Sequence, residues 1–258
     1  MKERLLVLAK AAPEASAKYQ ELICVAGITD KGEWRRVYPV PWEVFWGRSG
    51  KKFSKKQWIE YELVDDSPSD HRPESRKIKP NSIRALEEEE FANIEKMLSE
   101  RVTTIEDLMK EGSKKVSLGV VKPEILDFLP MDNSQYKKVL EMGKQTTLHG
   151  GKAYRLEPPE YKYQYVFKDV PGEERAHKML CEDWELERLY SGCKKRFQEN
   201  KYSSMEVVHE KVQDKMLNGI TKYEHVYFIV GTHVKFGTYL IVGVVYPRKA
   251  DIANGDIS

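Results

Sequence analysis

Short strand-like runs that are grouped apart from helix-like runs constrain the fold of this sequence more than any other feature. In residues 57–64, Trp58, Glu60 and Glu62 fall on one face and apolar side chains on the other, the period-two pattern of a half-buried strand. Comparable runs span 5–9, 22–29, 34–38, 81–86, 116–121, 125–129, 161–167, 223–230 and 239–245. Since regular β-α-β alternation is missing, the pattern predicts an α+β fold of β-rich, barrel-like modules with helical insertions.

Helical spacing is found in two parts of the chain. Phe91, Ile94 and Leu98 define a first helix, and a capping pattern at Thr104 followed by Gly112 predicts a second. The longest helical stretch spans 176–199, with Asp183 and Trp184 in its middle, so we expect the tryptophan on the core and the acid in solvent. A further helix is predicted from Ser203 to residue 217.

Strands followed by helices occur twice along the chain, which predicts two domains. We expect an N-terminal β-rich domain with a two-helix insertion over residues 1–131, and a C-terminal α+β domain over 132–258. A chain of 258 residues can bury a core of this kind without disulfides or a structural metal.

Cysteine usage and the amino terminus both bear on the compartment. Cys24, Cys181 and Cys193 are an odd number of cysteines without a CxxC spacing, which favours a reducing compartment. The amino-terminal apolar run covers residues 5–9 only, far short of the roughly 20 residues of a membrane span. We therefore expect a cytoplasmic protein.

The net charge limits how much of the protein surface can carry the positive charge that binds a nucleic acid. Lys and Arg total 43 against 41 Asp and Glu, whereas nucleic-acid modules are strongly basic as a whole. Positive charge that binds a partner must therefore be local.

Basic residues interleaved with aromatic ones are the best local candidates. Positive side chains attract phosphates and aromatic faces stack with bases, which is how OB-type grooves hold single strands. The alternative is that the aromatic residues belong to the core and the lysines to a solvated loop. The predicted nucleic-acid-binding residues come from the segments 34–38, 51–56, 71–77 and 231–237, and they are Trp34, Arg35, Arg36, Tyr38, Lys51, Lys52, Lys55, Lys56, Arg72, Arg76, Lys77, His233 and Lys235.

A second candidate platform lies in the aromatic run near the middle of the chain. Tyr161, Tyr163 and Tyr165 share one strand face. They form either a stacking surface or part of a sheet core with polar hydroxyl tips.

Eight segments together resemble a known family. They are Leu6-Val-Leu-Ala-Lys10, Cys24-Val-Ala-Gly-Ile28, Trp34-Arg-Arg-Val-Tyr-Pro39, Gln57-Trp-Ile-Glu60, His71-Arg-Pro-Glu-Ser75, Leu118-Gly-Val-Val-Lys-Pro123, Asp183-Trp-Glu-Leu186 and Phe228-Ile-Val-Gly-Thr232. The series is similar to the prokaryotic dual OB domain-containing proteins over nearly the whole chain. The resemblance implies two OB-like barrels with helical additions and, by analogy of fold, nucleic-acid binding; it supplies no catalytic residues.

Two metal-dependent alternatives stay open. His177 and Cys181 are four residues apart, as on one helical face, so with Cys193 they are candidates for zinc, although packing of the cysteines as small apolar groups is favoured. The carboxylates within residues 60–74 suggest a metal-dependent nuclease, but no supporting motif accompanies them. These acids are Glu60, Glu62, Asp65, Asp66, Asp70 and Glu74.

The sequence therefore predicts a non-catalytic nucleic-acid-binding accessory protein, with DNA or RNA, and single strands in particular, as its partner. No cofactor is predicted. The first alternative is a protein-interaction subunit that completes a larger prokaryotic nucleic-acid effector, such as a defence nuclease or a split Argonaute, and the second is the nuclease.

Overall fold

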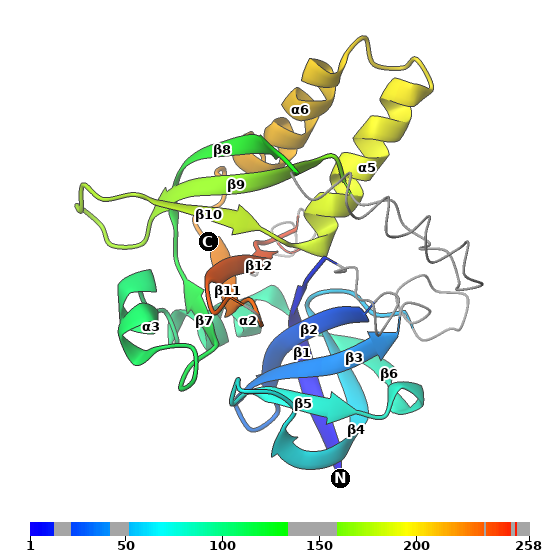
Figure 1. Cartoon of the computed structure of the whole chain (residues 1–258), viewed down its shortest axis with the longest axis vertical. Helices are drawn as coiled ribbons and strands as arrows, with labels where there is room; N and C mark the ends of the chain where they lie inside the picture. The colour runs from blue at the N-terminus through cyan, green and yellow to red at the C-terminus, as the bar shows by residue number, and fades with distance from the viewer. Residues whose placement is uncertain (13–21, 42–51, 134–158, 235, 249–250, 252–258) are drawn as a thin grey trace.

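The fold begins with a closed barrel of five strands, shown at the bottom of Figure 1. The computed structural model of the protein describes residues 1–12, 22–41, 52–133, 159–234, 236–248 and 251. The strands of the first sheet are β1 (Lys2–Lys10), β2 (Leu22–Thr29), β3 (Trp34–Pro41), β4 (Gln57–Pro68), β5 (Ser75–Ile78) and β6 (Arg84–Glu88). Their order is β1-β2-β3-β5-β4-β6, and β1 also pairs with β4. The β3–β5 pair is parallel, which gives the strand order of an OB-type barrel.

The interior of this barrel contains an ion pair as well as apolar side chains. Arg35 faces inward, and its Nη2 donates to Glu3 Oε1 at 2.8 Å. Tyr61 donates to the second oxygen of Glu3 at 2.6 Å. Burial, with the Glu3 carboxylate next to it, raises the pKa of Tyr61, so the phenol stays protonated and keeps donating.

Two short helices follow the first sheet, as the sequence predicts. They are α2 (Phe91–Ser99) and α3 (Ile105–Glu111), joined to the barrel by a 3-10 turn η1 (Pro80–Ser82) and β6. Thr104 caps α3, because its side chain accepts a hydrogen bond from the Asp107 N–H. Gly112 ends α3 with φ of 81°, a backbone angle that favours glycine.

The second sheet repeats the OB-type strand order. Its strands are β7 (Leu118–Val121), β8 (Glu124–Asp132), β9 (Tyr161–Lys168), β10 (His177–Cys181), β11 (Tyr227–Thr232) and β12 (Tyr239–Val245). The order is β7-β11-β12-β10-β9-β8, with β10 and β12 parallel. Only Lys122 and Pro123 separate β7 from β8. Strands β7 and β8 therefore act as the two halves of one strand, of which β7 pairs with β11 and β8 pairs with β9. The predicted α+β fold with OB-like modules is confirmed.

A helical hairpin connects the third and fourth strands of the second module and extends at the top of Figure 1. It consists of α5 (Trp184–Gln198), α6 (Met205–Gln213) and a π-helical turn η2 (Asp214–Asn218). The long helix predicted from residue 176 was wrong in its first part, because residues 177–181 pair with β9 as β10. Asp183 begins α5 as its N-cap and accepts from Glu185 N at 2.9 Å. The expectation of a solvent-facing acid was also wrong, since Asp183 is buried.

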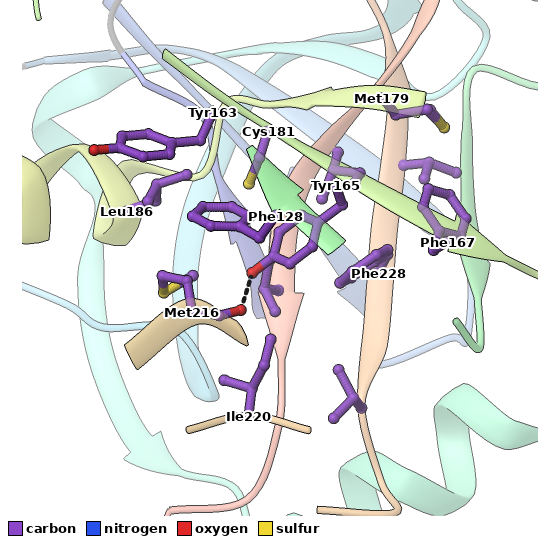
Figure 2. Packing of buried hydrophobic residues seen from close by; sticks show 14 of the residues in the cluster. Phe128, Tyr163, Tyr165, Phe167, Met179, Cys181, Leu186, Met216, Ile220 and Phe228 are labelled. Atoms are coloured by element: carbon purple, nitrogen blue, oxygen red, sulfur yellow. Dashed lines mark hydrogen bonds between the residues drawn. The ribbon is translucent and has the colours of Figure 1, made fainter. Parts of the chain in front are cut away.

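Aromatic side chains fill the second barrel (Figure 2). Phe128 stacks on Tyr163 with ring centroids 5.0 Å apart, and the Tyr165 hydroxyl donates to the Met216 carbonyl at 2.7 Å. Both tyrosines are buried, so the hypothesis of a stacking platform was wrong for them. Tyr161 is half-buried and packs edge-on against His209.

The two modules share an apolar junction. The outer face of β1 and β2 packs against β7, β11 and β12 through Leu6, Leu8, Ala26, Ile28, Tyr227, Ile229 and Val242. The backbones approach so closely that a Cβ on Gly243 of β12 would lie 2.7 Å from the Leu8 carbonyl oxygen, so only glycine fits there.

The sheets divide between β6 and β7, whereas the division predicted after residue 131 falls at the end of β8. The reason is that β7 and β8 pair with strands much later in the chain, and their local sequence does not show which sheet they join. Within the described ranges, no helix combines the length and apolar character needed to cross a bilayer.

Candidate nucleic-acid interface

Lys55, a predicted phosphate-binding residue, is buried at the junction of the modules. Its Nζ donates to Asp183 Oδ2 at 2.6 Å and to the Val244 carbonyl at 2.9 Å, and Glu185 lies 2.9 Å away. Burial alone would lower the pKa of this lysine, but the Asp183 and Glu185 carboxylates outweigh burial and raise it. Lys55 is therefore a charged link between the two barrels.

Three more predicted cations make the same kind of link. Lys56 Nζ donates to the Tyr246 carbonyl at 2.6 Å, and Arg36 Nη2 donates to the Ser117 carbonyl at 3.1 Å. Arg72 donates to the Thr232 carbonyl at 3.1 Å and is paired with Asp70. All three side chains are buried, and their hydrogen bonds go to the second module, to Asp70 and to Cys24 rather than to a solvent-facing track.

The remaining predicted residues are dispersed. Arg35 lies inside the first barrel, Trp34 packs at the junction, and Tyr38 is half-buried. Arg76 pairs with Asp66, while Lys52 and Lys77 are exposed. Lys51 and Lys235 lie outside the described residues. The structure therefore does not bring the predicted set together on one surface.

The usual ligand face of the first OB-type barrel is covered. OB-type barrels bind oligomers on the outer face of their second and third strands, beside the loops after the first and fourth strands. In the first barrel this face includes Ala26, Ile28 and Arg36, which pack against or bond to the second module. The corresponding face of the second barrel is the outer face of β9 and β10. Within the described ranges no residue of these two strands belongs to the apolar junction, so this face is open there.

Two lysines lie on this open face of β9 and β10. Lys178 of β10 is opposite Val166 of β9 and exposed, and Lys168 lies two residues further along β9 on the same face. Among the described residues neither lysine forms an ion pair, whereas Lys162 on the same strand pairs with Glu182 at 2.6 Å. Lys168 and Lys178 are thus positive charges available to an anionic ligand.

A cleft of about 480 Å³ opens beside β10. Its walls are α3, the start of β10 and the β11–β12 loop, and its lining residues are Ile105, Met109, Gly112, Ser113, His177, Lys178, Met179, Gly237, Thr238 and Tyr239. His177 is held by Asp169, with 2.8 Å between Nε2 and Oδ1. The lining is mainly apolar with a few polar groups, a composition typical of ligand sites.

The β11–β12 loop carries an exposed aromatic ring. Phe236 is 75% exposed, and its ring centroid lies 4.7 Å from that of His233, with 26° between the planes. Hydrogen bonds from His233 N to the Thr238 carbonyl and from Gly237 N to the His233 carbonyl, both 2.9 Å, define the turn. The sequence reasoning named His233 but missed Phe236, although an aromatic residue between Gly231 and Gly237 was a signal that could have found it.

The candidate zinc ligands are separated by the fold. His177 lies at the cleft with Asp169, while Cys181 and Cys193 are buried free thiols in the core of the second barrel. In the part of the chain that the structure describes, no three His, Cys, Asp or Glu side chains are grouped so that they could hold a metal ion.

The fold defines the class: a protein of two OB-type modules that meet at an apolar junction. Comparison with family models shows the family. The chain belongs to the family described as Domain of unknown function (DUF8757), whose model matches residues 99–256. Residues 1–106 match a second model, Domain of unknown function (DUF8758). No curated protein matches the chain.

Glu187 of α5, near the open face, gives a pH-dependent prediction. Burial, together with the nearby Glu182 carboxylate, raises the pKa of Glu187 from 4.5 to about 7. The folded protein therefore keeps this proton between pH 4.5 and 7 while the unfolded chain loses it, so this group makes stability fall as pH rises through that window. We expect Glu187→Gln to remove this part of the decline, measured by urea unfolding at pH 5 and pH 8; the exposed Glu210→Gln should leave the decline unchanged.

Proposed function

We propose that the protein is a non-catalytic nucleic-acid-binding accessory protein of the cytoplasm, and that the second barrel carries the interface. The observation that supports this best is the exposed Phe236 ring on the loop that borders β10, with Lys168 and Lys178 on the adjoining strand face. The resemblance to dual OB domain-containing proteins agrees with this proposal and stays a prediction.

The chemistry of this surface suits a nucleic acid. An exposed ring offers a face on which a base stacks, and such a contact contributes roughly 1–3 kcal/mol. Lysine ammonium groups attract phosphates, and each neutralised phosphate of a single strand adds about −0.7 to the slope of log K against log salt concentration. With two lysines in place, positive charge is local even though the whole chain is close to neutral.

Reversing both charges tests the proposal. We expect Lys168→Glu combined with Lys178→Glu to weaken binding of labelled single-stranded DNA or RNA about tenfold or more at low salt and to flatten the salt dependence. The measurement is fluorescence anisotropy across a salt series, with each sample checked on a gel for cleavage.

A matched control separates a local interface from net charge. Lys195 and Lys201 are exposed lysines of the helical hairpin that both pair with Glu199. Reversal of these two changes the net charge equally and should leave affinity nearly unchanged. An equal loss in both double variants would mean that the contact is non-specific and would contradict the assigned face.

A second candidate function is a protein-interaction subunit of a larger prokaryotic nucleic-acid effector, such as a defence nuclease or a split Argonaute. It is favoured by two exposed apolar side chains: Met109, which lines the same cleft, is 64% exposed, and Val234 of the β11–β12 loop is 39% exposed. Absence of oligonucleotide binding at low salt, together with a stable stoichiometric complex with the product of a neighbouring gene, would favour this function over the first.

A further inference from the structure

Resting on the proposed function, we propose that the cleft between α3, β10 and the β11–β12 loop holds one unstacked base, and that the ligand is therefore single-stranded. The chemical class of the occupant is a nucleotide within a DNA or RNA strand. Its base enters the cleft and its phosphates stay outside, on the β9–β10 face.

The size and lining of the cleft support a base as occupant. A volume of about 480 Å³ falls within the range of small-molecule sites, which is roughly 300–1,000 Å³. Met109 and Met179 provide apolar, polarizable walls that pack against a flat ring. Ser113 and Thr238 provide hydroxyl groups that both donate and accept, as the polar edge of a base requires.

The position of Lys178 links the cleft to the open face. This lysine lines the cleft and also belongs to the outer row of β9 and β10 that includes Lys168. A strand that follows this row places a phosphate at Lys178 when the adjoining base is in the cleft. The Phe236 ring, on the loop that forms another wall of the cleft, is then available to stack with a neighbouring base.

The shape of the site selects against a duplex. A base reaches a cleft walled by a helix, a strand and a loop only after leaving its stack and its pair. A single strand has no pairing to lose, whereas extrusion of a base from a duplex breaks its pair and its stacking contacts. We therefore expect single strands to bind at least about tenfold more tightly than duplexes of the same sequence.

The test fills the cleft with an added aromatic side chain and measures whether a base of the bound strand leaves its stack. Ser113 lies in the turn after α3 and lines the cleft, so Ser113→Phe places a ring inside it. Its control, Ser203→Phe, adds the same ring at an exposed position before α6. The probe is a single-stranded oligonucleotide with one 2-aminopurine, whose fluorescence rises when the base leaves its stack; the free protein's melting temperature checks folding. Met109→Trp, at a largely exposed position on α3 itself, also fills the cleft and serves if Ser113→Phe does not fold.

We expect the fluorescence rise with the wild type and with Ser203→Phe, and its loss with Ser113→Phe, accompanied by about tenfold weaker binding. If the wild type binds the oligonucleotide but folded Ser113→Phe and Met109→Trp match it in affinity and fluorescence, the base pocket is wrong while the proposed function stands. Equal affinity for single strand and duplex would likewise overturn the pocket. If the wild type binds no oligonucleotide at low salt, both the pocket and the proposed function fall.

Discussion

Replacing Asp183 with alanine is expected to lower the free energy of unfolding by about 3–5 kcal/mol, because it leaves a buried ammonium group without its main counter-charge. The Asp183 carboxylate is 1% exposed. It accepts from Lys55 Nζ at 2.6 Å, from Val244 N at 2.7 Å and from Glu185 N at 2.9 Å. The substitution therefore removes an N-cap of α5, a partner of β12 and the counter-charge of Lys55 at once.

Urea unfolding at pH 7 measures this effect. The exposed pair of Lys2 and Glu60 gives the control, because Lys2→Ala removes an ion pair whose lysine is largely in solvent and should cost less than about 1 kcal/mol. Lys55→Met combined with Asp183→Ala should recover part of the loss, since no unpaired charge then stays buried. A loss below about 1 kcal/mol for Asp183→Ala alone would show that the junction is not closed around this pair in solution.

The strand pattern of the sequence predicts much of this fold. The runs 22–29 and 239–245 coincide with β2 and β12, and the cap at Thr104 with the stop at Gly112 delimits α3. These signals are local, because alternation and capping depend on residues a few positions apart.

The sequence does not show whether the outer face of a strand is exposed to solvent or packs against another part of the protein. Lys55 meets Asp183 at a separation of 128 residues, and Arg36 meets the Ser117 carbonyl at a separation of 81. A basic residue between aromatic ones has the same local sequence whether its side chain lies in solvent or packs against a second barrel. Of the predicted phosphate contacts, Arg36 lies on a strand face that the second module covers, while Lys55, Lys56 and Arg72 lie outside the strands and bond to that module.

The error at β10 has a related cause. Leu180 and Trp184 have helical spacing, yet Met179 and Cys181 also alternate toward the aromatic core, and pairing with β9 decides in favour of the strand. The β9 pairing is with a neighbouring strand, but the parallel contact of Cys181 with Ile241 of β12 involves a residue far along the chain, so helical periodicity within 176–199 alone cannot choose.

Replacing Phe236 with alanine is expected to weaken oligonucleotide binding by roughly 1–3 kcal/mol, a factor of about 5 to 150 in Kd, because it removes the exposed stacking face of the β11–β12 loop. Stability should stay the same, since a ring that is 75% exposed contributes little to the core. Fluorescence anisotropy at fixed salt measures the change in Kd, and thermal unfolding checks the fold.

The conservative variant decides between stacking and a merely local disturbance of the loop. Phe236→Trp keeps an aromatic face and should bind as tightly as the wild type, whereas Phe236→Leu keeps apolar bulk without a ring and should resemble alanine. If leucine restores binding, the loop makes an apolar contact of the kind a protein partner would make. Because Met109 of the cleft and Val234 of the β11–β12 loop are also exposed, that result would indicate that the same surface of the second barrel binds a protein rather than a nucleic acid.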